Sequence, residues 1–379
     1  MKIAHILFSN GLEYDDRIRK EMFSIREVLE GNVEFKIFAF SSDNNRAESG
    51  VLSYGIPYEY VKVAYLDSKK KDIITMLRKE YSFYSQVANK VKDFDLLWVC
   101  DDQPFFFPLF SGKPIIWDLH EIPESIIGSR LKNALFHRME NRCTWLIHAN
   151  KERLDYLVNH KIVKRPNKNL ILHNYPDHNW LIAGSNKSEG FHRFEEWLGG
   201  DDYLYVQGLA GKGRFALETL AAIMEAHIIK AVVVGKVPDE VESVIATKYP
   251  DSDKFLYYTG QIIQSETSAY MSSSRFSIVF YNSNTANSRY CEPNRMFQSL
   301  GLGLPVIVGS NEPMLNVVNK YGNGIVLGSD GHNTEEIVSA IKEINTHYLK
   351  YKDMAMRYKN LFAWETQLPV FYKLFKNNK

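Results

Sequence analysis

Residues 291–309 place a cation beside a predicted helix start. Asn294 is a good N-cap residue, because its side-chain oxygen can accept a hydrogen bond from a free backbone N–H of the first turn. The expected first turn carries Arg295 and no acidic side chain. The positive end of the helix and the guanidinium would therefore favour an anion together. The alternative is an ordinary helix, turn and buried strand within an α/β sheet.

A histidine flanked by carboxylates follows another predicted strand. His120 has Asp118 and Glu121 as near neighbours, and such a group can bind a metal, move a proton or hydrogen-bond a ligand hydroxyl. No second histidine lies at ligand spacing, and Pro123 opposes the helix of an H-E-x-x-H zinc site, so we predict no metal. A structural histidine is the alternative. Asp101 follows a strand too, as a candidate general base or a solvated loop carboxylate.

Strands and helices must position these residues. Strand-like runs alternate with helix-like segments, which favours parallel sheets with helices on both faces, and the pattern restarts after the turn-rich residues 174–177. We predict two successive α/β domains with a cleft between the carboxyl ends of their sheets. The expected strands are 3–8, 33–40, 96–100, 115–117, 145–149, 203–207, 231–234, 255–258, 276–280 and 306–308, and the expected helices are 15–29, 69–92, 130–142, 214–227, 238–248 and 264–273.

Length and composition agree with this organisation. The 379 residues suffice for two domains of roughly 150 residues each, and 45% apolar with 24% charged residues is ordinary for a globular chain. A net charge of +1 gives no reason to expect nucleic acid. Three cysteines without metal or pairing spacing favour a cytoplasmic location. No apolar run approaches the ~20 residues of a membrane span, and 3–8 is expected to be a strand rather than a signal peptide.

Several fragments resemble, in order along the chain, the landmarks of GT-B glycosyltransferases of the family 4 type. PNRMFQSLGLGLPVI (293–307) is similar to their P-N-K-x-x-E helix and following strand, which hold the sugar nucleotide. WDLHEIPE (117–124) resembles their D-x-H-E strand end, whose histidine lies beside the donor sugar. The other matching fragments are NG (10–11), DDRIRKE (15–21), NKERLDYL (150–157), LHNYPD (172–177), VQGLAGKGRFALETLAA (206–222), YYTGQI (257–262) and FAWE (362–365).

This resemblance implies a GT-B fold with two Rossmann-like domains that face each other across a cleft. The first domain, 1–177, would shape the acceptor site and receive the returning helix 365–379, and the second, 178–364, would bind the donor. The implied activity is transfer of a hexose-type sugar from a UDP- or GDP-type donor to a saccharide or lipid-linked saccharide in bacterial-type cell-surface polysaccharide synthesis. Retention of configuration, without a metal or other cofactor, is also implied.

The resemblance further implies roles for single residues. Arg214 and Arg295 are expected to stabilise the leaving diphosphate, because guanidinium presents a planar fork to phosphate oxygens; the alternative for each is a surface cation. His120 and Glu292 are expected at the sugar. The remaining donor-side candidates are Gly11, Lys212, Gly260, Gln261, Ile262, Asn294 and Gln298, and the acceptor-side candidates are Asp16, Arg17, Asp101 and Glu121.

Three positions depart from the family pattern. The two usual glutamates fall on Tyr290 and Gln298, and the usual arginine of the second domain's first loop falls on Leu209. Gln298 can still hydrogen-bond a ribose, although without charge. These departures keep two alternatives open: a sugar-nucleotide epimerase or hydrolase on the same fold, and a catalytically inactive binding subunit.

A basic amphipathic stretch, 68–92, could lie on an anionic membrane. A peripheral position at the inner face of the membrane would follow, and would suit a lipid-linked acceptor. The alternative is a solvated helix packed on the first sheet.

Overall fold

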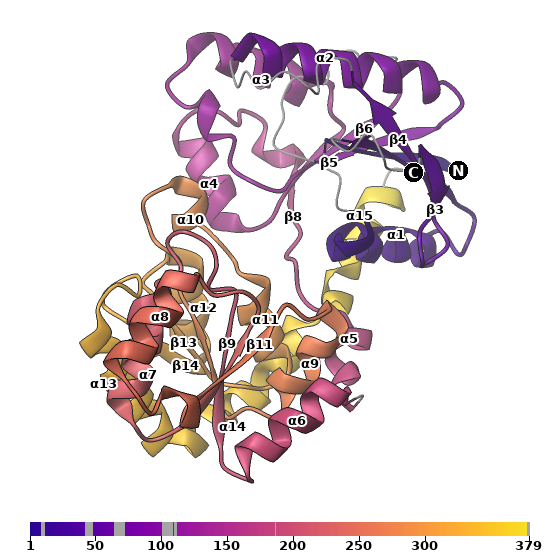
Figure 1. Ribbon diagram of the computed structural model, residues 1–379. Coiled ribbons are helices and arrows are strands. Elements are labelled where there is room, and N and C mark those ends of the chain that lie inside the picture. The colour runs from indigo at the N-terminus through magenta and orange to yellow at the C-terminus, as the bar shows by residue number, and fades with distance from the viewer. Residues whose placement is uncertain are drawn as a thin grey trace. The chain divides into compact units, whose positions relative to one another are not determined.

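The computed structural model describes residues 1–8, 12–41, 48–63, 73–100, 109, 112–185 and 187–376 (Figure 1). The chain divides into two compact units. The first contains Met1–His173 and Gln367–Lys379, and the second contains Asn174–Thr366.

The first unit is built on an eight-stranded sheet of order β3-β4-β2-β1-β5-β6-β7-β8, parallel except for the β3–β4 pair. Its central strands are buried on both faces, as a covered parallel sheet requires, and are apolar except for His5 in β1 and Asp118 in β6. The strands are β1 (Lys2–Leu7), β2 (Glu34–Ser41), β3 (Ser49–Val51), β4 (Pro57–Lys62), β5 (Leu96–Cys100), β6 (Ile115–Leu119), β7 (Trp145–His148) and β8 (Asn169–Ile171). The helices are α1 (Asp16–Val28), α2 (Ile73–Lys90), α3 (Arg130–Arg142), α4 (Lys151–Asn159) and α15 (Leu368–Phe375).

Helices cover both faces of this sheet. α1 and α15 lie side by side on one face, with α2 and α3 on the other (Figure 1). Phe371 of α15 is fully buried, and its ring stacks on that of Trp98 with centroids 6.3 Å apart. The prediction that the last helix returns to the first domain is therefore confirmed.

The second unit contains a six-stranded parallel sheet of order β11-β10-β9-β12-β13-β14. Successive strands are added in one direction from β9 to β11 and in the other from β12 to β14, so the topology switches between β9 and β12. Ligands of open α/β sheets bind at such a switch point, beyond the carboxyl ends of the strands. The strands are β9 (Tyr203–Gln207), β10 (Lys230–Val234), β11 (Leu256–Gly260), β12 (Ser277–Val279), β13 (Val306–Val308) and β14 (Gly324–Val326). The helices are α5 (His178–Ile182), α6 (Glu189–Leu198), α7 (Ala216–Ala226), α8 (Asp239–Lys248), α9 (Gln264–Ser272), α10 (Ala286–Arg289), α11 (Asn294–Gly301), α12 (Glu312–Tyr321), α13 (Thr334–Thr346) and α14 (Tyr348–Tyr358).

The candidate membrane stretch corresponds to α2. Tyr84 is fully buried among the rings of Phe8 and Phe83, so it belongs to the core of the first unit, whereas Tyr81 is 54% exposed. The lysines at 69–71 lie outside the described residues. No helix in the described part of the chain is both long and apolar enough to span a bilayer.

Candidate functional site

Two arginines meet at the switch point of the second sheet. Arg214 lies in the loop between β9 and α7, and Arg295 is the second residue of α11. Both guanidiniums face the ring of Tyr281, which follows β12. The Cζ atom of Arg214 lies 3.3 Å from the ring centroid, and that of Arg295 lies 4.9 Å from it. The negative faces of one aromatic ring thus hold two like charges near each other.

Two glycines let the loop after β9 approach this pair. Gly208 has φ 74°, and a Cβ there would lie 2.7 Å from Nη1 of Arg295. Gly213 has φ 77°, and a Cβ there would lie 1.6 Å from Nδ2 of Asn282. A side chain at either position would therefore be strained and would collide with a site residue or its neighbour.

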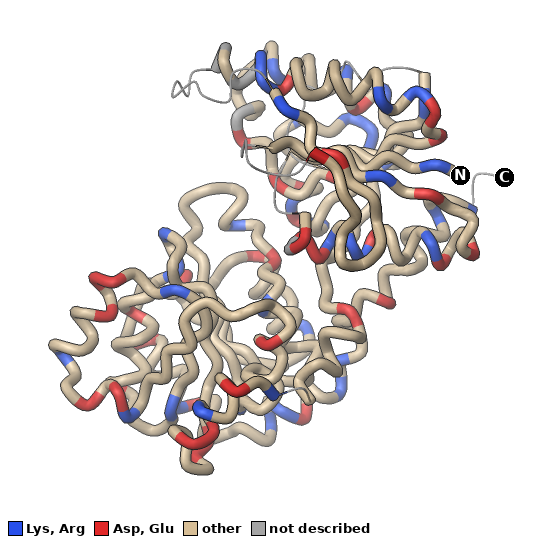
Figure 2. The backbone as a smooth tube through the Cα atoms, turned by 45° about the vertical axis from the view of Figure 1, so that its right-hand side comes forward, with Lys and Arg blue, Asp and Glu red and all other residues tan. Residues whose placement is uncertain are grey.

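The positive charge of this pair has no acidic partner in the part of the chain that the structure describes. Lys, Arg, Asp and Glu are interspersed along both units (Figure 2), but among the described residues no carboxylate forms an ion pair with Arg214 or Arg295. Burial and then the charge of Arg295 lower the pKa of Arg214 to about 10, and burial lowers that of Arg295 to about 10. Both stay protonated at neutral pH. Nη1 of Arg214 and Nε of Arg295 are buried without an acceptor in the described chain. An anion with several oxygens would supply the missing acceptors and charge.

The two arginines differ in how much of their hydrogen bonding is already used. Arg295 donates from Nη1 to the carbonyls of Gln207 and Gly208, and from Nη2 to the carbonyl of Phe280 at 3.1 Å. It therefore ties the start of α11 to the ends of β9 and β12. Arg214 makes no such bond in the described structure, so its fork is the freer of the two.

The prediction that Asn294 is the N-cap of its helix is wrong. α11 begins one residue earlier, because Pro293, with φ −69° and ψ 129°, already provides the extended residue before the helix. The Asn294 side chain instead accepts a hydrogen bond from Nδ2 of Asn174 at 3.0 Å. Glu292, before the proline, is half-buried. The first turn carries no acidic side chain, as expected.

The other donor-side candidates are spread along the same edge of the sheet. Lys212 is exposed in the Arg214 loop, and Gly260, with φ 65°, ends β11 with Gln261 exposed beside it. The Ile262 side chain packs on the apolar core, so only its backbone is free for a ligand. Gln298 is 7% exposed, so it is part of the core as well as of this edge.

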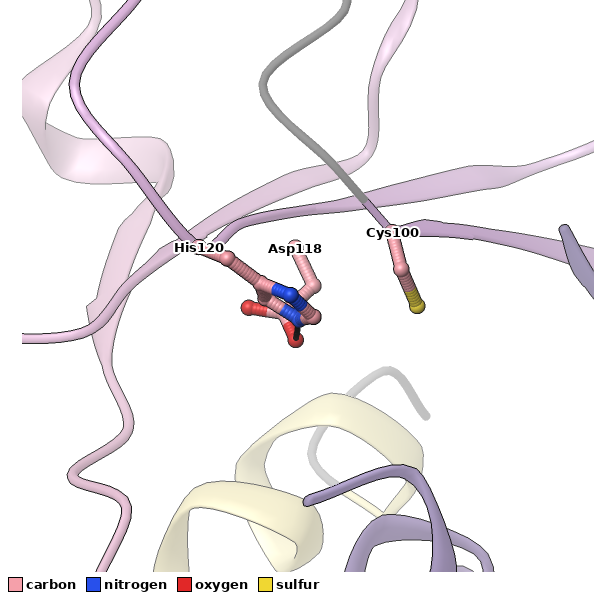
Figure 3. A group of neighbouring side chains, drawn as sticks. All are labelled: Cys100, Asp118 and His120. Atoms are coloured by element: carbon pink, nitrogen blue, oxygen red, sulfur yellow. Dashed lines mark hydrogen bonds and ion pairs between the residues drawn. The ribbon is translucent and has the colours of Figure 1, made fainter. Parts of the chain in front are cut away.

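A second polar group lies at the carboxyl edge of the first sheet. Asp118, at the end of β6, is fully buried, and its Oδ2 lies 2.8 Å from Nε2 of His120. Arg17 of α1 donates two hydrogen bonds to the same carboxylate, from Nε to Oδ2 at 2.9 Å and from Nη2 to Oδ1 at 2.8 Å. It also donates from Nη1 to the carbonyl of Leu172. Figure 3 shows His120, Asp118 and Cys100 projecting to the same side of the sheet.

These contacts set the charges of the group. Burial alone would raise the pKa of Asp118, but the charges of Arg17 and His120 hold it well below its usual range. Burial opposes the charged form of His120 as well, yet the Asp118 carboxylate raises its pKa above the usual value. Asp118 is thus an anion held by the guanidinium of Arg17 and by the imidazole of His120.

Cys100, Asp118 and His120 could in principle hold a metal, since their ligand atoms lie within 4.8 Å of one another. The guanidinium of Arg17 occupies the position that a cation would need, because it donates to both oxygens of Asp118. A metal would have to displace a buried Arg. The chemistry of this group is therefore that of an ion pair, and we assign no metal to it.

Comparison with known proteins identifies the fold. No protein-family model matches the sequence, and no curated protein matches it either. Solved structures match over the length of the chain. Sucrose-phosphate synthase from Thermosynechococcus elongatus has a TM-score of 0.75 at 12% identity and covers 100% of this chain and 99% of its own. Anabaena HepE in complex with UDP has a TM-score of 0.70 at 13% identity with 100% of both chains covered. WaaG, a glycosyltransferase involved in lipopolysaccharide biosynthesis, has a TM-score of 0.64 at 13% identity, covering 97% and 99%.

The chain has the GT-B fold. The prediction drawn from the ordered sequence fragments is confirmed at this level, and the family 4 assignment stays a prediction.

Of the acceptor-side candidates, Asp16, Arg17 and Glu121 are described, and they have different surroundings. Asp16 pairs with Arg19 and Lys20 on its own helix, with Nζ of Lys20 2.9 Å from Oδ2. Arg17 is buried in the Asp118 network, and Glu121 is exposed beside His120. Gly11 and Asp101 lie outside the described residues.

Tyr281 was missed in the sequence, although it directly follows the predicted strand 276–280. Its position at the end of a predicted strand could have indicated a binding residue, because ligands of open α/β sheets bind beyond the carboxyl ends of strands.

Proposed function

We propose that this GT-B protein is a glycosyltransferase that moves a hexose-type sugar from a UDP-type nucleotide sugar to a saccharide or lipid-linked saccharide. The observation that carries the proposal is the uncompensated stack of Arg214, Tyr281 and Arg295 at the switch point of the second sheet. Structures similar to this chain include HepE in complex with UDP, with UDP and glucose, and with UDP-glucose, which supports a nucleotide-sugar donor.

Cleavage of a sugar–diphosphate bond builds negative charge on the leaving oxygens. Fixed cations that already point at that place stabilise the charge without reorganising during the reaction. Arg214 suits this role because its fork is unpaired and stacked in place, and Arg295 adds a second positive charge. Two such cations can neutralise a diphosphate without a divalent ion, so we expect transfer to continue in EDTA.

On the acceptor side, His120 is the group best prepared to hydrogen-bond a sugar hydroxyl. Asp118 holds its Nε2, which leaves Nδ1 for a ligand. We propose a retaining reaction, in which the leaving phosphate accepts the acceptor proton and no enzymic base is required. WaaG acts in lipopolysaccharide biosynthesis, which supports a cell-surface glycan as the product.

Nucleotide binding by calorimetry and thermal shift tests the proposal. UDP and UDP-glucose, but not GDP, ADP or CMP, should raise the melting temperature. At a hundredfold excess over the dissociation constant, binding adds about 2.7 kcal/mol to the free energy of unfolding. Arg214→Ala should weaken UDP binding about tenfold, which is ~1.4 kcal/mol. Arg193→Ala is the matched control, because Arg193 is exposed on α6 and pairs with Glu189 of the same helix.

Each other outcome has a meaning. A wild-type protein that binds no nucleotide would overturn the proposed function. Binding without turnover would favour the inactive binding subunit, and donor conversion without an acceptor would favour an epimerase or hydrolase.

A further inference from the structure

Glu21 is a buried carboxyl whose oxygens receive no aligned hydrogen bond. It lies one turn after Arg17 on the inner side of α1 and is fully buried. Neither of its oxygens has a hydrogen-bond donor among the described residues. Nε of Arg17 lies 2.9 Å from Oε1, but its N–H is directed at Oδ2 of Asp118. The single fork of Arg17 is thus aligned with Asp118 and not with Glu21.

An ionised carboxylate in this position would be buried without the donors that stabilise it, which is costly. A protonated carboxyl would instead gain a donor of its own. The adjacent acceptor is the Asp118 carboxylate. Burial raises the pKa of Glu21 well above its usual value, and the charge of Asp118 raises it further.

We propose that Glu21 is a neutral carboxylic acid that donates a hydrogen bond to Asp118, and that Glu21 and Arg17 are positioning residues for His120. The inference rests on the proposed function, in which His120 contacts a sugar hydroxyl. Arg17 and Glu21 fix the Asp118 carboxylate from one side. Because a carboxylate can only accept, Asp118 takes the Nε2–H of His120 and orients the ring with Nδ1 toward the ligand.

Two other histidines near Asp118 do not change charge near neutral pH. Burial lowers the pKa of His5 on β1 to about 3 and that of His148 on β7 to about 4. Asp15, the N-cap of α1, and Cys100 of β5 also lie near this group, and Arg153 of α4 donates to the backbone carbonyl of His120. His5 and His148 therefore stay neutral in the folded protein at neutral pH, whereas the Asp118 carboxylate raises the pKa of His120 above its usual value.

The titration of His120 in the full-length protein tests the proposal. Histidine labelled with ¹³C and ¹⁵N reports each imidazole by NMR, and His120→Gln identifies the signal. In Glu21→Gln, which keeps a neutral donor, the midpoint should stay within about 0.3 pH units, whereas Asp118→Asn should lower it by about one unit or more. If Glu21 were ionised, Glu21→Gln would remove a negative charge beside His120 and lower its midpoint too. That result would overturn the proposal.

A measurement on the wild-type protein applies even where Glu21→Gln does not fold. In a sample labelled with ¹³C at glutamate carboxyls, at least one signal should keep the shift of a protonated acid through pH 7. The absence of every such signal overturns the proposal. Where Glu21→Gln folds, it should remove that signal.

Activity separates positioning from folding. Glu21→Leu removes the donor and should lower kcat about tenfold or more while KM for the donor stays unchanged, and Glu21→Gln should restore kcat. Equal kcat in Glu21→Leu and the wild type would overturn the positioning role. Both NMR readouts need no substrate, so failure of the proposed transferase activity would be distinguishable from failure of this inference.

Discussion

The guanidinium of Arg214 lies 3.3 Å from the ring centroid of Tyr281, and no carboxylate in the described chain balances its charge. Arg295 shares the same ring at 4.9 Å, yet its N–H groups are bonded to backbone carbonyls. The sequence alone predicts the same role, stabilisation of a diphosphate, for both arginines. In the structure their roles differ, because Arg295 also hydrogen-bonds α11 to the ends of β9 and β12, whereas Arg214 forms no such bond in the described chain.

We therefore expect Arg295→Ala to destabilise the second unit and Arg214→Ala to leave its stability unchanged. Loss of the charged donors to the Gln207, Gly208 and Phe280 carbonyls should cost about 2 kcal/mol. Arg214→Ala removes no hydrogen bond and relieves a like-charge repulsion. Urea denaturation of both variants measures the difference. Equal midpoints would show that Arg295 does not support the fold.

Tyr281 should contribute to nucleotide binding through its ring alone. Tyr281→Leu removes the surface on which both guanidiniums stack, and should weaken UDP binding about five- to thirtyfold, since a cation–π contact is worth ~0.5–1 kcal/mol and two are lost. Tyr281→Phe keeps the ring and is the matched control. Titration calorimetry gives both affinities. An equal loss in the two variants would assign the effect to the hydroxyl.

The sequence predicts strand bounds best where a strand is buried on both faces of its sheet. The apolar runs 96–100 and 203–207 were predicted with the bounds that β5 and β9 have. β14 was not predicted, because its three residues, Gly324–Val326, are only half-buried and carry no periodic pattern. The short hairpin partner β3 was missed for the same reason.

The polar network of the first unit could not be predicted from local sequence. Arg17 lies in the charged run 15–21, which reads as an exposed helix face. Only tertiary contact with Asp118, 101 positions later in the sequence, makes it a buried residue. Glu21 looks like a partner for Arg17 at i,i+4 spacing, but Asp118 receives the aligned hydrogen bonds. Single-sequence patterns do not contain such long-range pairings.

Gly213→Ala should destabilise the protein more than an ordinary glycine substitution at positive φ. Its Cβ would lie 1.6 Å from Nδ2 of Asn282, so the loop or the strand end must move in addition to the left-handed strain. We expect a loss of about 2–3 kcal/mol, against ~1 kcal/mol for Gly199→Ala, which has φ 65° and open space around it. Thermal denaturation compares them. Similar losses would mean that Asn282 moves aside freely.

His5 should make the stability of the protein depend on pH below 6.5. It is fully buried against Trp98 without a hydrogen-bond partner for either ring nitrogen in the described structure, and burial lowers its pKa to about 3. Between that value and the ordinary pKa of an unfolded histidine, about 6.5, the unfolded chain binds a proton that the folded chain does not. Stability must therefore fall as the pH falls through this window.

At pH 5 the loss attributable to His5 is about 2 kcal/mol, from one and a half pH units at 1.36 kcal/mol each. His5→Phe keeps a ring on Trp98 and removes the titration, so its free energy of unfolding relative to the wild type should be higher at pH 5 than at pH 8 by about that amount. His192→Phe serves as control, because His192 lies exposed on α6. Urea titrations at the two pH values measure the difference. A difference that is the same at both would show that His5 is protonated inside the folded protein, or that the unfolded chain keeps it buried.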